Sequence, residues 1–127
     1  MTMVLVDTSV WVDHFRFGDP QLASLLEEGE AVCHPFIIAE LACGILPDRA
    51  DTLGRLKDMP HVDVASQEEI LSMIDTHRLM GAGLGFVDVH LLASARLSMI
   101  PLWTRDLSLK KAAAKLDVLF PLAKGSF

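Results

Sequence analysis

Short apolar runs alternate with longer amphipathic stretches along the chain. Residues 3–6 (MVLV) form an uninterrupted apolar run that stops at Asp7, which is typical of a buried strand in a parallel sheet. The same criteria predict strands at residues 3–6, 31–34, 61–65, 100–104 and 117–120. Helical periodicity and capping signals predict helices at residues 8–16, 20–28, 35–46, 49–58, 66–80, 86–97 and 106–115. Strands that alternate with helices favour an α/β fold with a mostly parallel central sheet.

Length and strand order set an expectation for where a site lies. The 127 residues fit one domain, 1–127, because compact domains commonly contain about 100–150 residues. In open parallel sheets, ligands bind outside the carboxyl ends of the strands. Asp7 directly follows the first predicted strand and Asp106 closely follows the strand at 100–104. We therefore expect a site at this edge of the sheet.

Charge and motifs narrow the function classes. The net charge is −6, opposite in sign to that of proteins that hold nucleic acid by charge alone, so an RNA partner would require bound cations or a local basic patch. No HExxH, GxxxxGK[ST] or GxGxxG motif occurs, which argues against zinc, nucleoside triphosphates and dinucleotides. Apolar runs fall short of the roughly 18 residues that span a membrane. With no basic leader at its start, the protein is expected to be soluble and cytoplasmic, without membrane contact.

Glu40 is the most unusual charged residue of the sequence. It is the only charge in PFIIAELACGIL (35–46), with no Lys or Arg within one helical turn. Helical spacing places it on a face with Ile37 and Leu41, so its side chain is expected to point toward packed structure. Buried glutamates need a partner. A neutral, hydrogen-bonded Glu40 is one interpretation, and a site shared with a metal or a second acid is the favoured one.

Three aspartates each have a simple capping explanation. Asp7 and Asp106 stand at helix N-cap positions, and Asp88 lies in the first turn of the helix at 86–97, where the helix dipole favours an acid. Gathered with Glu40, however, they would repel one another by about 4 kcal/mol per pair at an effective dielectric of 20. Such a cluster requires raised pKa values or bound cations. Oxygen-only ligands select hard ions, Mg²⁺ or Mn²⁺.

Four motifs in order carry a family resemblance. They are LVDTSVWVD (5–13), PFIIAELACGIL (35–46), GFVDVHLLASA (85–95) and LWTRDLSLKKAA (102–113). Together they resemble PIN-domain proteins over essentially the whole chain, and more narrowly the VapC-type toxins of bacterial toxin–antitoxin pairs. The resemblance implies a three-layer α/β/α sandwich and hydrolysis of RNA with Mg²⁺ or Mn²⁺. It further implies inhibition by a cognate antitoxin and a homodimer.

The resemblance also assigns roles to residues. The implied catalytic acids are Asp7, Glu40, Asp88 and Asp106, of which the three aspartates are assigned to the metal. Hydroxyls expected to hold the carboxylates or a metal-bound water are those of Thr8, Ser9 and Thr104. Many relatives carry a further acid where this chain has Ser108, which predicts that a second ion binds weakly or only with substrate.

Other interpretations stay open at this point. Arg105, Lys110 and Lys111 cluster near the last acid, either as a solvated helix face or as contacts to RNA phosphates. A non-catalytic module for partner binding or dimerisation would use the same fold without turnover. An aspartate-based phosphotransfer enzyme would use Asp7 as its nucleophile, but such a phosphatase would want a second acid two residues later, where Ser9 stands.

Overall fold

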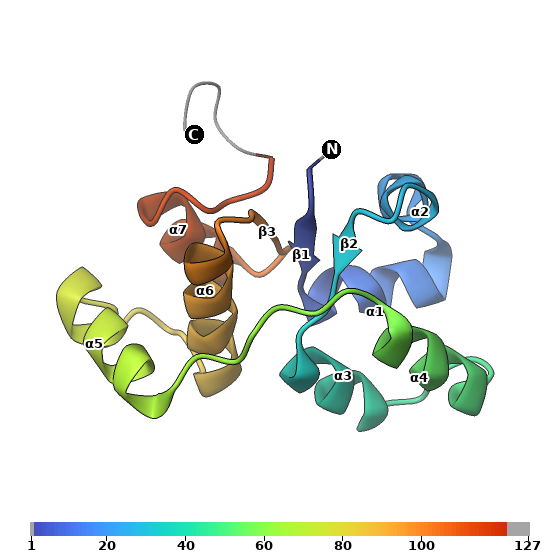
Figure 1. Cartoon of the computed structure of the whole chain (residues 1–127), viewed down its shortest axis with the longest axis horizontal. Coiled ribbons are helices and arrows are strands. Elements are labelled where there is room, and N and C mark those ends of the chain that lie inside the picture. The colour runs from blue at the N-terminus through green and yellow to red at the C-terminus, as the bar shows by residue number, and fades with distance from the viewer. Residues whose placement is uncertain (1, 122–127) are drawn as a thin grey trace.

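A three-stranded parallel sheet forms the centre of the molecule in the computed structural model, which describes residues 2–121. The central strand β1 (Val4–Val6) pairs with β2 (Ala31–Val32) on one side and with β3 (Leu102–Trp103) on the other. All three strands run parallel in the order β2-β1-β3, so their carboxyl ends share one edge of the sheet (Figure 1). Asp7 directly follows β1 at that edge.

Helices cover both faces of this sheet. They are α1 (Thr8–Phe17), α2 (Pro20–Glu27), α3 (Pro35–Ala42), α4 (Arg49–Asp58), α5 (Gln67–His77), α6 (Phe86–Ser98) and α7 (Leu107–Lys115). In Figure 1, α1, α2 and α4 lie to the right of the strands, α3 lies below them, and α5 to α7 lie to the left. This arrangement confirms the predicted α/β/α sandwich with a parallel central sheet. Within the described residues, no helix is both long and apolar enough to span a bilayer.

Burial on both faces explains why β1 is an uninterrupted apolar run. Val4, Leu5 and Val6 are all fully buried, and they belong to one hydrophobic cluster with Leu91 and Leu92 of α6. Burial of each such aliphatic side chain contributes about 1.5–3 kcal/mol to folding. A polar residue is therefore tolerated only where β1 leaves the cluster, at Asp7.

Local capping signals are confirmed where side chains meet nearby backbone. Ser66 Oγ accepts a hydrogen bond from the Glu69 amide, and Glu69 Oε1 accepts one from the Ser66 amide, which completes the predicted capping box of α5. The Asp106 side chain caps α7, which begins at Leu107 instead of at residue 106. Both motifs act within three or four residues, so the rest of the chain does not alter them.

Two predicted strands do not form as strands. In residues 61–65, only His61 pairs with the sheet, through a single parallel bridge to Cys33. The polar alternation also breaks at Val64, whose side chain is 45% exposed. In residues 117–120, only Leu119 forms a bridge, to Leu102. Each segment thus forms one bridge at an edge of the sheet and does not continue it as a ladder.

Two predicted helices end earlier than their apolar pattern indicated. The helix expected over 35–46 stops at Ala42, and Arg49 donates hydrogen bonds to the carbonyls of Ala42 and Gly44 beyond its end. The helix expected to reach residue 80 stops at His77, because Arg78 adopts a left-handed conformation with φ of 53°. Hydrogen bonds to the last carbonyls from Arg49, in the first case, and the local backbone geometry at Arg78, in the second, outweighed the hydrophobic pattern.

Candidate active site

Asp7 is the buried centre of the acidic site. Its side chain is 6% exposed, and its Oδ2 accepts hydrogen bonds from Ser9 Oγ at 2.8 Å and from Thr104 Oγ1 at 2.7 Å. A buried carboxylate requires such donors to remain charged. The hydroxyls predicted at positions 9 and 104 therefore do lie against the first acid, although residues 7 and 104 are 97 positions apart.

Asp88 lies close enough to two other acids to feel their charge. Burial raises the pKa of the Asp88 carboxyl, and repulsion from Asp7 and Asp106 raises it further, against a lowering by the hydrogen bond from the Gly85 amide. That amide donates to Asp88 Oδ2 at 2.9 Å at the start of α6. The contributions of Asp7 and Asp106 to this shift indicate that the three aspartates lie near enough for their charges to interact.

Asp106 occupies the solvent side of this region. Its Oδ1 accepts a hydrogen bond from the Leu109 amide at 2.9 Å, so Asp106 is the N-cap of α7. The Asp106 amide donates to Thr104 Oγ1, and that hydroxyl donates to Asp7. The residue is exposed. The reason is its position in the turn between β3 and α7, above the sheet edge.

Glu40 is exposed, and the prediction that it points toward packed structure is wrong. Its neighbours Ile37 and Leu41 are buried, but residue 40 lies on the part of the α3 surface that faces solvent. Its partner is a hydroxyl: Thr8 Oγ1 donates to Glu40 Oε1 at 2.7 Å. The predicted role of Thr8 is thus tied to Glu40 instead of to Asp7.

The four acids share one property. Each uses one carboxylate oxygen for a hydrogen bond within the chain, and its other oxygen accepts none from the part of the chain that the structure describes. The oxygens left open in this way are Asp7 Oδ1, Glu40 Oε2, Asp88 Oδ1 and Asp106 Oδ2. The side chains are thus oriented by the protein and still able to bind a ligand.

The acids do not form a closed cage. Over residues 2–121, no three His, Cys, Asp or Glu side chains lie close enough together to hold one metal ion between them. Mg²⁺ commonly binds one or two carboxylates and keeps water or substrate phosphate oxygens in its other positions. The open carboxylate oxygens and the repulsion around Asp88 fit that mode of binding.

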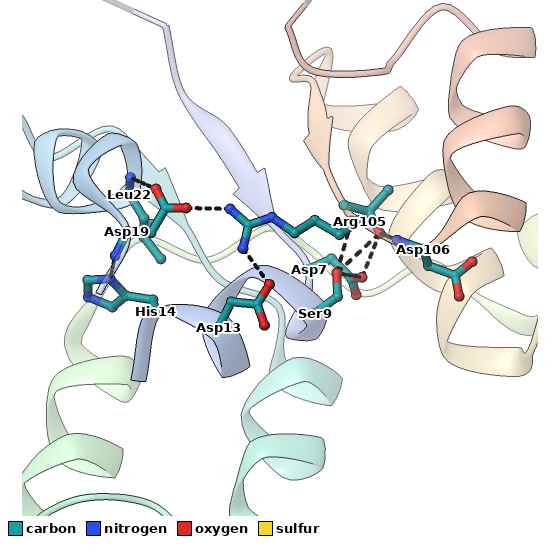
Figure 2. Close-up of polar contacts among 9 residues, drawn as sticks. Asp7, Ser9, Asp13, His14, Asp19, Leu22, Arg105 and Asp106 are labelled. Atoms are coloured by element: carbon teal, nitrogen blue, oxygen red, sulfur yellow. Dashed lines mark hydrogen bonds and ion pairs between the residues drawn. The ribbon is translucent and has the colours of Figure 1, made fainter. Parts of the chain in front are cut away.

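The basic residues near Asp106 separate into two groups. The Arg105 guanidinium turns away from Asp106 and pairs with Asp13 and Asp19, as Figure 2 shows. Lys111 is exposed and Lys110 is half-buried on α7. Sequence reasoning missed Asp13 and Asp19, because they are 92 and 86 positions from Arg105 and no local signal links them.

Ser108 lies against a glycine turn. A Cβ atom at Gly83 would approach Ser108 Oγ to 3.1 Å, and Gly83 itself has φ of +77°, a conformation that favours glycine. The position at which many relatives carry an acid is therefore packed closely by the turn that precedes α6.

An apolar groove reaches one of the four acids, Glu40. It has a volume of about 600 Å³ and lies between α1 and the turn that connects α3 with α4. Thr8 and Glu40 contribute to it beside apolar side chains, and Ile45 is fully exposed there. Its lining includes Val12, Phe15, Leu41, Ile45, Leu46 and Pro47.

The chain belongs to the PIN-domain family, whose model matches residues 4–115. Within that family, the VapC-type resemblance is confirmed: the chain is 44% identical over 117 residues to the ribonuclease VapC32 of Mycobacterium tuberculosis, with 91% of this chain and 94% of that protein covered.

Solved structures confirm the fold. A DNA-bound VapBC from Salmonella typhimurium matches with a TM-score of 0.68 and 14% identity, covering 87% of this chain and 92% of that one. A toxin–antitoxin complex from Klebsiella pneumoniae matches with a TM-score of 0.54 and 19% identity, covering 81% and 86%.

Proposed function

We propose that this protein is a Mg²⁺- or Mn²⁺-dependent endoribonuclease that acts as the toxin of a toxin–antitoxin pair. The observation that carries the proposal is the set of four acids, from four separate segments, each held through one oxygen and open at the other. The 44% identity to a protein named as a ribonuclease supports the same activity.

Asp7, Asp88 and Asp106 are the residues that would hold the cation. Their carboxylate oxygens match the preference of Mg²⁺ and Mn²⁺ for hard ligands. A cation among them would relieve the repulsion from Asp7 and Asp106 that adds to the effect of burial in raising the pKa of Asp88. A divalent ion supplies activation of water, orientation of the scissile phosphate and stabilisation of the leaving oxygen.

The remaining residues orient the acids and the substrate. Ser9 and Thr104 fix the Asp7 carboxylate, and Thr8 fixes Glu40 at the mouth of the groove. Lys110 and Lys111 lie on α7, the helix that Asp106 caps, where ammonium groups would attract RNA phosphates. This local positive charge, with the cations, would offset the net charge of −6.

The two alternative functions, aspartate-based phosphotransfer and partner binding without catalysis, make different predictions. Phosphotransfer would leave an acid-labile phosphate on Asp7, but the second acid that a phosphatase requires is replaced by Ser9, which donates its hydroxyl to Asp7. A binding-only module would show no turnover with any metal.

Removal of metal is expected to stop RNA cleavage. We expect the rate on an oligoribonucleotide pool labelled at both ends to fall about 100-fold or more in EDTA and to return with excess Mn²⁺, because the acids act through the cation. Asp88→Asn should reduce cleavage to a similar extent in Mg²⁺. Gel analysis of both labels would distinguish internal cuts from trimming at the ends.

Asp75→Asn is the matched control, because it removes the same charge from an exposed position on α5. It is expected to cleave as the unmodified protein does. Cleavage that persists at full rate in EDTA, or in Asp88→Asn, would refute metal-dependent catalysis at this site.

The apolar groove is the proposed docking site of the antitoxin. A segment that fills it would reach Glu40 and Thr8 and so cover the site. The groove is lined by one charge of each sign, Glu40 and Arg16, beside its apolar side chains, which favours an occupant that is apolar on one face, with a basic group toward Glu40 and an acidic group toward Arg16. A related fold in a toxin–antitoxin complex supports a protein occupant.

Ile45→Lys tests that docking site. Because Ile45 is fully exposed, the substitution should not disturb folding or RNA cleavage, yet it should weaken binding of the adjacent reading frame's product about tenfold or more. Calorimetry measures the affinity, and sedimentation of the protein alone measures whether the proposed homodimer forms. Unchanged affinity would place the partner elsewhere, and loss of the dimer in Ile45→Lys would assign the groove to a second copy.

A further inference from the structure

Arg105 makes an unusual set of contacts beside the acidic site. Its Nη1 pairs with Asp13 Oδ2 of α1 at 2.6 Å, and its Nη2 pairs with Asp19, the N-cap of α2. The guanidinium also lies 5.7 Å from the centre of the Trp103 ring. One side chain thus joins the turn after β3 to both α1 and α2 (Figure 2).

In these contacts, two carboxylates compensate the positive charge of Arg105. Hydrogen bonds to Asp19 and Asp13 raise the pKa of the Arg105 guanidinium. The pKa of Asp19 is lowered, first by the hydrogen bond from the Leu22 amide and also by Arg105. With two carboxylates already bound, Arg105 offers no uncompensated charge to a phosphate in this arrangement.

The backbone of the same residue connects to the catalytic acids. The Arg105 amide donates to Ser9 Oγ at 3.0 Å, and Ser9 Oγ donates to Asp7. On either side of Arg105, Thr104 Oγ1 donates to Asp7, and the Asp106 amide donates to Thr104 Oγ1. The backbone of residues 104–106 is therefore bound to Asp7 on its inner side, and the Arg105 side chain anchors it on its outer side.

We propose that Arg105 is a positioning residue, and that its ion pairs with Asp13 and Asp19 fix the turn at residues 104–106 so that Asp106 and Thr104 stay in register with Asp7. The inference rests on the proposed nuclease function. It replaces the contact to RNA phosphate that the sequence suggested for Arg105, and it assigns Asp13 and Asp19 a role in the site without contact to substrate.

The expected effect on activity exceeds the effect on stability. Both ion pairs of Arg105 reach the surface, with side-chain exposures of 35% for Arg105, 45% for Asp13 and 14% for Asp19, and ion pairs in contact with solvent contribute little to the free energy of unfolding. Catalytic groups, however, are sensitive to position: a displacement of about 1 Å can lower a rate about 100-fold. Loss of the ion pairs should therefore lower kcat while the melting temperature changes little.

Asp13→Asn and Asp19→Asn test the proposal with opposite outcomes for the two roles of Arg105. The Asp19→Asn side chain keeps an oxygen to cap α2, because the capping atom is Oδ1 and the ion pair uses Oδ2. If Arg105 positions the turn, the double variant should lose about tenfold or more in kcat, with KM for RNA nearly unchanged. If Arg105 instead binds phosphate, its release from both carboxylates should lower KM, and that result would overturn the proposal.

Asp51→Asn is the control, because it breaks an exposed ion pair with Arg55 on α4, and neither residue hydrogen-bonds to one of the four acids. It should leave kcat and KM unchanged. A loss in this variant equal to that of the double variant would show a general effect of charge and would also overturn the proposal.

A readout without RNA separates this proposal from the nuclease function. Amide hydrogen exchange by NMR should show faster exchange of the Arg105 amide in the double variant, because its hydrogen bond to Ser9 depends on the anchored turn. Affinity for Mn²⁺, measured from free Mn²⁺ by electron paramagnetic resonance, should fall in parallel. If the unmodified protein cleaves no RNA, the proposed nuclease function fails, but amide exchange still tests whether Arg105 anchors the turn. If exchange of the Arg105 amide is unchanged in the double variant, the anchoring role is refuted even where RNA cleavage is confirmed.

Discussion

Asp7→Asn is expected to lower RNA cleavage about a thousandfold while the fold persists. Asp7 is buried at the end of β1, so its carboxylate is the central charge of the site. Asparagine keeps an oxygen that accepts from Ser9 and Thr104 but lacks the negative charge that would bind a cation. Removal of a single preorganised electrostatic group typically lowers kcat about 100- to 1,000-fold, and a buried metal ligand is expected to lie at the upper end.

The Asp88 carboxyl reports independently on this substitution. Since repulsion from Asp7 contributes to the raised pKa of Asp88, that pKa should fall toward its ordinary value in Asp7→Asn, as measured by NMR titration without metal. Asp75→Asn should alter neither the rate nor the titration of Asp88. Full cleavage by folded Asp7→Asn would exclude Asp7 from catalysis, and an unmoved Asp88 titration would exclude the proximity of the two acids.

His34 is expected to make the fold sensitive to acid. It is fully buried, and its Nδ1 accepts a hydrogen bond from the Phe36 amide at 2.9 Å, which caps α3. The neutral ring therefore carries its proton on Nε2, which is buried without a hydrogen-bond partner among the described residues. Burial, with smaller effects from His90 and His61, lowers the pKa of His34 from 6.5 to about 4.

The direction of the pH dependence follows from that shift. Below pH 6.5, the unfolded chain binds a proton at His34 that the folded chain does not bind until about pH 4. The free energy of unfolding therefore has its full value above pH 6.5 and falls toward pH 4, by up to about 1.4 kcal/mol per pH unit and about 3 kcal/mol in total. His34→Asn keeps an acceptor for the Phe36 amide but removes the titration.

Urea unfolding between pH 7.5 and 4 measures this effect. We expect His34→Asn to be less stable than the unmodified protein at pH 7.5, because of the smaller buried side chain, and to lose less stability as the pH falls. His61→Asn, at an exposed position, should retain the steep dependence. Parallel pH profiles for the unmodified protein and His34→Asn would show that His34 does not carry the acid sensitivity.

Sequence reasoning succeeded where a feature depends on neighbouring residues. The apolar run before Asp7 predicted β1, and the box at Ser66 and Glu69 predicted the start of α5. The predicted cap at Asp106 also depends on an amide three residues later. These features involve one turn of chain, so the residues that decide them are adjacent in the sequence.

Predictions failed where the outcome depended on distant partners. The apolar pattern of residues 61–65 gave no information on how far the segment would follow β2, and it forms only one bridge, at His61. Helical periodicity placed Glu40 on an inward face, but the adjoining α1 leaves that position exposed and provides Thr8 as its partner. Neither result could be read from spacing alone.

The sequence by itself determined the α/β class and the end of β1 at Asp7, and it named the four acids as a candidate set, because apolar periodicity, capping chemistry and ordered motifs are properties of local sequence. Only the tertiary structure decided that Thr8 holds Glu40, that Thr104 holds Asp7 and that Arg105 pairs with Asp13 and Asp19. Those contacts join residues more than 30 positions apart, and they exist only because the parallel sheet brings the carboxyl ends of its strands to one edge.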